Sequence, residues 1–208
     1  MQAKILAGPA GALAALGEEW RALEAVAPGH SFFQSWSWIG CLAEERFTEP
    51  VLLRAVTGDR TIGLALCNRR GSALHLTESG DARMDRLFVE HNAPLVAAEA
   101  PEGTAARMLG AALGLPGVRR LVLGGVPPGL LAAVSGVALR RQDRPAPRVD
   151  LVALRASGQG YRASLSRNTR QQLARSLRRY AGHGPVALAR AGSVTEALRW
   201  FDALVALH

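Results

Sequence analysis

The sequence predicts a mixed α/β fold in which helices flank a β-sheet. Two early segments carry apolar residues at helical spacing, and two apolar, strand-like runs farther on enclose a typical hairpin turn. Strands and helices then alternate up to about residue 155. With 208 residues, of which 49% are hydrophobic, the chain can bury a core without disulfides or metals.

The first elements are a strand and two helices. Residues 4–7 form a short apolar run, and Gly8-Pro9 then begins a predicted helix that extends to about Val26. Its apolar positions recur at helical spacing: Leu13, Leu16, Trp20, Leu23 and Val26. Pro28-Gly29 ends this helix, and Ser31 is the predicted N-cap of a second one that extends to about residue 43.

The middle of the chain is rich in strands. Thr57-Gly58-Asp59-Arg60 predicts a hairpin turn between strands 51–56 and 61–68. Further strands are expected at 73–77, 94–97, 119–124, 137–141 and 147–155. Helices are expected at about 101–113 and 127–134.

A hinge is predicted at Ser157-Gly158-Gln159-Gly160, which divides the chain into domains at 1–156 and 157–208. A basic helix at about 161–181, a strand at 186–191 and a helix from Ser193 to the terminus follow. These elements cannot form a complete domain alone, so we expect the chain to be incomplete.

Charge is concentrated at the C-terminal end. The formal net charge is +8, and residues 140–208 hold 13 basic and 4 acidic side chains, so an anionic partner is expected there.

Cys41 and Cys67 lie in apolar segments and are expected to be reduced and mostly buried. The sequence has no signal-peptide pattern and no apolar run of about 18 residues, so we expect a cytoplasmic protein without a transmembrane segment.

Several short motifs occur together along the chain. They are Ser31-Phe32-Phe33-Gln34-Ser35-Trp36-Ser37-Trp38, Glu78-Ser79-Gly80-Asp81, Glu90-His91-Asn92-Ala93-Pro94-Leu95, the basic run Tyr161 to Leu173 with its Leu165-Ser166-Arg167-Asn168-Thr169-Arg170, and the terminal Ala206-Leu207-His208. Together they resemble the CelD-like and FemAB-like acetyltransferases, which consist of two GNAT-like domains in tandem. The resemblance implies a largely antiparallel GNAT-like sheet in the first domain and the start of a second GNAT-like domain.

The resemblance also implies an acyl-CoA-dependent N-acyltransferase that uses acetyl-CoA as the donor. The acceptor would be an amine on a small molecule or a cell-envelope precursor. In GNAT proteins a loop of pattern [Q/R]-x-x-G-x-[G/A] before a helix holds the donor's pyrophosphate. At the matching place, residues 100–105, Gly103, Thr104 and Ala105 are the candidate cofactor ligands, whereas Ala100 replaces the Gln or Arg. The same pattern recurs at residues 155–160, where a hinge is expected as well.

Amine acylation needs a base that accepts the amine proton. The candidate catalytic residues are Glu90, Asp81 and Glu78, with His75 and His91 nearby in the sequence. Their spacing matches no strong metal-ligand pattern, and no metal is expected. On the basic helix, the candidate ligands for an anionic group are Arg167, Asn168, Arg170 and Arg175.

Two alternatives stay open at this point. The first is a FemAB-type aminoacyl transferase of cell-envelope biosynthesis, for which the basic helix would contact tRNA; other nucleic acids are not expected, because few aromatic side chains surround the helix. A polyprenyl diphosphate or a membrane surface would also suit the arginines. The second alternative is a non-catalytic GNAT-like binding domain. The oligomeric state is not predicted.

Overall fold

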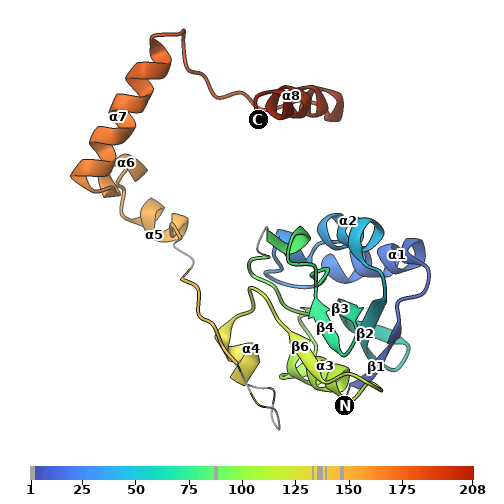
Figure 1. Ribbon diagram of the computed structural model, residues 1–208. Coiled ribbons are helices and arrows are strands. Elements are labelled where there is room, and N and C mark those ends of the chain that lie inside the picture. Colours follow the sequence, from blue (N-terminus) through green and yellow to red (C-terminus); the bar gives the residue numbers. More distant parts are fainter. Residues whose placement is uncertain (1–2, 87–88, 133, 135–137, 139, 146–147) are drawn as a thin grey trace. The chain divides into compact units, whose positions relative to one another are not determined.

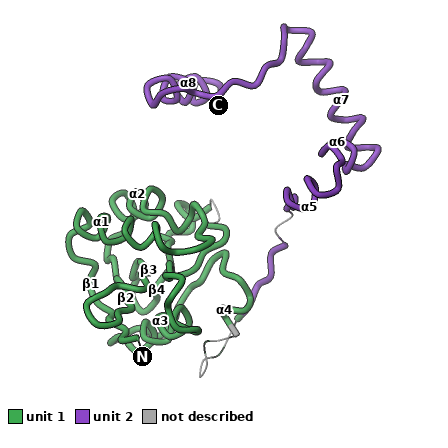
Figure 2. Tube along the Cα trace, turned by 180° about the vertical axis from the view of Figure 1, so that it is seen from behind, with its two compact units in different colours: residues 1–140 green, residues 141–208 purple. Residues whose placement is uncertain are grey.

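The computed structural model describes residues 3–86, 89–132, 134, 138, 140–145 and 148–208 (Figure 1). The chain divides into two compact units, residues 1–140 and 141–208, which we describe separately (Figure 2). The predicted domain boundary, between residues 156 and 157, falls inside the second unit and stays a prediction.

The first unit is built on a mixed sheet of six strands. Its order is β1 (Lys4–Pro9), β2 (Pro50–Thr57), β3 (Arg60–Arg70), β4 (Ala73–Leu76) and β6 (Arg120–Val122), and β5 (Leu95–Val96) pairs with β3. All neighbouring strands are antiparallel except β4 and β6, which are parallel. The predicted mixed α/β class, with a largely antiparallel sheet flanked by helices, is therefore confirmed.

The centre of the sheet is the hairpin of β2 and β3. Its turn is the predicted one: Thr57 pairs with Arg60, and Gly58 takes a φ of +60° that a side chain would disfavour. Residues 62–68 of β3 are all buried, because helices cover both faces of the sheet. A run of this kind cannot alternate between polar and apolar residues.

Helices α1 (Leu13–Glu24) and α2 (Trp36–Arg46) cover one face of the sheet, and α3 (Thr104–Leu113) covers the other (Figures 1 and 2). The short helix α4 (Pro128–Ala132) and the 3₁₀ turns η1 (Phe32–Gln34) and η2 (Met84–Arg86) complete the unit. Leu53, Leu64, Leu66, Leu74 and Met108 are fully buried in the core between these layers.

Trp36 joins α1 to α2. It is 7% exposed, and its ring centroid lies 5.9 Å from that of Trp20. Its indole fills the space above two glycines: a Cβ at Gly17 would lie 2.6 Å from Nε1, and a Cβ at Gly40 would lie 2.7 Å from Cε2. The two helices can therefore approach closely only because each has a glycine at the contact.

The second unit contains α5 (Leu151–Ala156), α6 (Tyr161–Ser164), α7 (Arg167–Ala181) and α8 (Val194–Ala206). None of its described residues is buried. The side-chain oxygens of Asp150, Ser166 and Ser193 accept backbone N–H bonds at the starts of α5, α7 and α8. Local capping thus accounts for where these helices begin.

Several sequence expectations are corrected. The predicted strand at 147–155 is wrong: within its described part, residues 148–155, Asp150 caps helix α5. Residues 186–191 form no strand, because a strand needs a neighbour and the described part of this unit offers none. The basic helix is broken at Leu165–Ser166, where Ser166 caps α7.

At the N-terminus the helix predicted from residue 9 begins at Leu13 instead. β1 continues through Pro9, because Gly8 and Pro9 pair with Leu52 and Val51. Ser31 begins η1 rather than α2, whose N-cap is Ser35. Of the predicted strand at 137–141, residues 137 and 139 lie outside the described residues, and residues 138, 140 and 141 are not in a strand.

Candidate functional site at the carboxyl ends of β4 and β6

The only parallel pair among the described strands ends in a cluster of polar groups. β4 ends at Leu76 and β6 at Val122, and α3 lies between them in the chain. In sheets with parallel strands, ligands bind beyond the carboxyl ends, because the following loops all leave there. We therefore take this edge as the candidate functional site.

Asn92 connects the two strand ends. Its Nδ2 donates hydrogen bonds of 3.0 Å to the carbonyl oxygens of Leu76 and Gly124, and its backbone N–H donates to the oxygen of Gly125 at 3.0 Å. The side chain is 0% exposed. Because both amide hydrogens face carbonyl oxygens, the orientation of the amide is fixed, and Oδ1 is left buried without a hydrogen-bond partner among the described residues.

The backbone around Asn92 is strained. Thr77 and His91 have φ angles of +55° and +51°, the left-handed region that residues with a side chain rarely adopt. Thr77 directly follows β4, and its N–H donates to the carbonyl of Leu66 at 3.0 Å. Strain of this kind persists only where the surroundings enforce it, and it is concentrated at binding sites.

Two glycines bring the candidate base residues to this edge. A Cβ at Gly124 would lie 2.6 Å from Oε1 of Glu78, and a Cβ at Gly125 would lie 3.2 Å from the Cα of Glu90. Glu78 is half-buried and Glu90 is exposed. The structure thus places Glu78 and the backbone of Glu90 against the same two residues, at the end of β6.

Asp81, the third candidate base, is directed elsewhere. Its carboxylate lies 3.3 Å from Nη1 of Arg70 and accepts the N–H of Arg83 at 2.8 Å. The N–H of Arg83 and the guanidinium of Arg70 lower the pKa of Asp81 below its ordinary value. A carboxylate held in its charged form in this way is a weaker base, so Asp81 fits a structural role better.

The loop that follows β4 is held by two polar residues that the sequence analysis did not select. Asp85 accepts hydrogen bonds from the backbone N–H groups of Ser79 and Gly80 and from the Ser79 hydroxyl, at 2.7 to 2.9 Å. Buried Asn68 donates to the carbonyl of Ser79 at 2.7 Å. The polar motif at 78–81 indicated a loop here, but no sequence signal connected it to a residue on β3.

His75 lies on β4 beside this loop. A Cβ at Gly80 would lie 2.8 Å from its ring, so the imidazole packs under the loop. Burial lowers the pKa of His75 below its ordinary value; Arg120 and Arg70 add to this, and the Asp85 carboxylate opposes it. Among the described residues no group of three or more His, Cys, Asp and Glu side chains is arranged to hold a metal ion.

The predicted cofactor loop lies away from this edge, at the start of α3. Gly103 has a φ of +75°, Thr104 is buried, and Ala105 lies in the first turn. The Thr104 hydroxyl donates to the Pro101 carbonyl at 2.6 Å and accepts a hydrogen bond from Arg107 at 3.1 Å. The hydroxyl hydrogen of Thr104 is therefore already donated within the protein.

A shallow hollow of about 280 Å³ lies beside this helix start, lined by Thr57, Arg60, Ile62, Glu99 and Pro101. Arg60, its one basic lining residue, forms an ion pair with Glu99. Glu102 adds a further negative charge in the loop. A pyrophosphate would therefore meet two acidic groups here, although Arg107 in the first turn of α3 forms no ion pair with a described residue and its Nε is buried without a hydrogen-bond partner among them.

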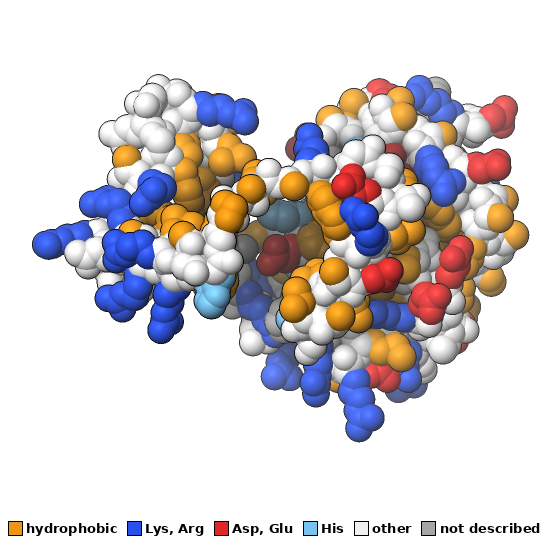
Figure 3. Space-filling view, turned by 90° about the horizontal axis from the view of Figure 1, so that it is seen from above, with side chains coloured by type: hydrophobic (Ala, Val, Ile, Leu, Met, Phe, Trp, Pro, Cys, Tyr) orange, Lys and Arg blue, Asp and Glu red, His pale blue; other side chains and the backbone are white. Residues whose placement is uncertain are grey.

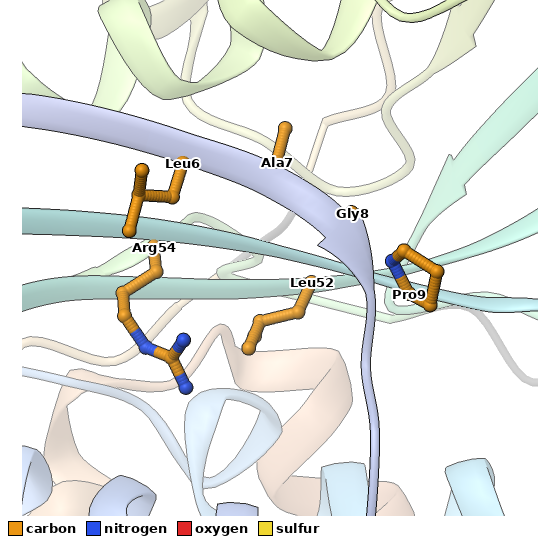
Figure 4. Close-up of a pocket in the computed structure, with 6 residues that line it drawn as sticks. All are labelled: Leu6, Ala7, Gly8, Pro9, Leu52 and Arg54. Carbon is orange, nitrogen blue, oxygen red and sulfur yellow. The ribbon is translucent and has the colours of Figure 1, made fainter.

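A second hollow, of about 180 Å³, lies along β1 and β2 (Figure 4). Leu6, Leu52 and Arg54 point to the same side of these strands. Nε and Nη2 of Arg54 donate to the carboxylate of Glu19, at 2.8 and 2.5 Å, and the Thr61 hydroxyl donates to it as well. The Arg54 guanidinium, which lines this hollow, is therefore already paired with Glu19 within the protein.

The predicted anion ligands lie on α7, with Arg167, Asn168 and Arg170 among its first four residues and Arg175 near its middle. Arg167, Asn168 and Arg175 are exposed. Arg170 instead donates to the carbonyl oxygens of Ala163 and Leu165, at 3.2 and 2.5 Å, and so joins α7 to α6. Blue side chains crowd the left-hand part of Figure 3, where α7 lies.

No protein-family model matches this chain, and no curated protein or solved structure is significantly similar to it. The likeness to CelD-like and FemAB-like acetyltransferases therefore stays a prediction from motifs. Among the described residues no helix is both long enough and apolar enough to cross a membrane.

Proposed function

We propose that the chain belongs to an acyl-CoA-dependent N-acyltransferase that transfers an acetyl group from acetyl-CoA to an amine. The observation that supports this most is the arrangement of β4, α3 and β6, in which two parallel strands end together beside Glu78, Glu90 and Asn92. The resemblance to GNAT-like proteins implies a largely antiparallel sheet, and the sheet of the first unit agrees with that expectation.

The reaction would be a direct transfer. The amine nitrogen attacks the thioester carbonyl, and a carboxylate accepts the amine proton. As the amide forms, the C–S bond breaks, and the leaving thiolate of coenzyme A takes up that proton to become the thiol. Glu78 is the better candidate for the base, because it is half-buried whereas Glu90 is exposed. The Glu78 carboxylate also lies against Gly124, beyond the end of β6, where the two parallel strands end together.

The donor's diphosphate does not suit the start of α3, where Glu99 and Glu102 lie. In the second unit, Arg167, Asn168 and Arg175 stay the predicted ligands for an anionic group, because they are exposed and no arginine of α7 forms an ion pair with a described residue. Guanidinium groups bind phosphate oxygens in pairs, which gives both affinity and orientation.

Calorimetric titration of acetyl-CoA into the whole chain tests this proposal. We expect saturable binding of acetyl-CoA to the unaltered chain. Release of free coenzyme A thiol in the presence of amines should fall in E78Q without loss of donor binding. Absence of binding to the unaltered chain would refute the proposal.

The first unit has a second candidate function as a non-catalytic binding domain. Asn92 and its neighbours occupy the gap between the ends of β4 and β6 and bond to both of them. This hydrogen-bonded segment would have to move for a ligand to enter between the strands. If titration detects no acetyl-CoA binding while the unit is folded, this candidate is favoured.

A further inference from the structure

We propose that the second unit binds the surface of an anionic lipid bilayer, through the arginines of α7 together with the apolar faces of α7 and α8. This inference does not depend on the proposed enzymatic function. In this unit exposed arginines and exposed apolar side chains both recur at helical spacing.

The charge comes from α7. Arg175, Arg178 and Arg179 follow one another at helical spacing and share one side of the helix with Arg167. Residues 151–195 contain eight arginines and no acidic residue. No described carboxylate pairs with the arginines of α7, so their charge is directed outward.

The opposite side of α7 is apolar. Leu173, Leu177 and Tyr180 recur at i, i+4 and i+7, and Tyr180 is 67% exposed. A helix with arginines on one face and Leu and Tyr on the other is typical of segments that lie in the membrane interface. Long arginine side chains can extend from such a helix to the lipid headgroups.

The apolar area comes mainly from α8. Val194, Leu198, Phe201 and Val205 lie on one face, and each is at least 58% exposed. Trp200 and Leu204 widen this face. Exposed Trp and Phe side chains suit the boundary between lipid headgroups and acyl chains.

The two helices together favour a bilayer over a nucleic acid. A phosphate backbone would neutralise the arginines of α7 but would leave the apolar face of α8 in water. An anionic bilayer covers both, and stable membrane attachment generally needs an electrostatic and an apolar contribution together. No membrane-crossing helix is required, which agrees with the lengths of α7 and α8, 15 and 13 residues.

Co-sedimentation of the whole chain with vesicles tests the proposal. We expect binding to vesicles of equal parts phosphatidylcholine and phosphatidylglycerol, and little binding to phosphatidylcholine alone. Because each arginine near an anionic surface contributes about fivefold in affinity, R178Q/R179Q should weaken binding roughly 30-fold. The control R21Q/R83Q removes the same charge from exposed positions of the first unit and should have no such effect.

The apolar contribution is tested by L198Q/F201Q. Both side chains are exposed, so the substitutions should leave the helix intact, which circular dichroism checks, and should still weaken binding at least tenfold. The proposal is overturned if the unaltered chain does not sediment with anionic vesicles, or if R178Q/R179Q binds as tightly as the control. Binding to tRNA but not to vesicles, lost in R178Q/R179Q, would overturn it in favour of a nucleic-acid partner.

Discussion

Replacing Asn92 by alanine should destabilise the first unit strongly. The substitution removes two hydrogen bonds of 3.0 Å and leaves the carbonyl oxygens of Leu76 and Gly124 without this donor at a fully buried position. Each bond contributes about 1 kcal/mol, and a stranded buried acceptor costs about 1–3 kcal/mol more. We expect a loss of about 2–4 kcal/mol in the free energy of unfolding.

Urea denaturation followed by tryptophan fluorescence measures this loss. Three of the four tryptophans lie in the first unit, and W200F removes the fourth, so the signal then reports on that unit alone. N92A in this background should lower the midpoint at an unchanged m-value.

Two further variants control the experiment. N92D keeps the size of the side chain but replaces the amide donor with a buried carboxylate, so it should destabilise at least as much as N92A. N168A changes an exposed asparagine on α7 and should alter stability by less than about 0.5 kcal/mol. If N92A behaves like N168A, Asn92 does not hold the ends of β4 and β6 together.

Three other predictions concern the same unit. The expectation that both cysteines are mostly buried is wrong for Cys41, which is exposed because it lies outside the buried side of α2. In the native chain a thiol reagent should therefore modify Cys41 but not Cys67, whose burial raises its pKa to about 12. Both should react after denaturation, and two rapidly reacting native thiols would contradict the fold. G125A should lower the free energy of unfolding by about 2–4 kcal/mol, because its Cβ would overlap a backbone carbonyl oxygen at a φ of +64°. G71A, at a φ of +60° with free space around it, should lower it by less. Equal losses would exclude the overlap as the cause. Burial raises the pKa of Glu19, but hydrogen bonds from Arg54 and Thr61 outweigh it and lower the pKa from its ordinary value of 4.5. The stabilising effect of Glu19 is therefore present above pH 4.5 and is lost as the pH falls through the folded-state pKa. The stability difference between the wild type and E19Q should shrink below pH 4.5, and a constant difference would argue against the ion pair.

The sheet of the first unit could be predicted well from sequence because its signals are local. The turn at Gly58-Asp59 and the apolar runs on either side of it determine the hairpin without reference to distant residues. The strand predicted at 147–155 failed for a related reason. Alternating apolar residues suit a strand only beside a neighbouring strand, and the local cap at Asp150 was sufficient to begin a helix.

The candidate site was predicted only in part. Glu78 and Glu90 were selected from the sequence as acids near a predicted strand, and the structure brings them to the end of β6. Asn92 and Gly125 were not selected, because their roles arise from contacts across about 30 residues of chain. Such contacts leave no periodic pattern in a single sequence.

The packing of Trp36 between Gly17 and Gly40 restricts how any small molecule can approach the sheet. α1 cannot slide along α2 without driving the backbone of Gly17 into the indole of Trp36, so this contact fixes the two helices against each other as one layer, or plate, over the sheet. Access through that face would require the whole plate to lift from the core. A small molecule that bound the first unit would therefore have to approach at the rim of the sheet, where the loops after β4 and β6 emerge.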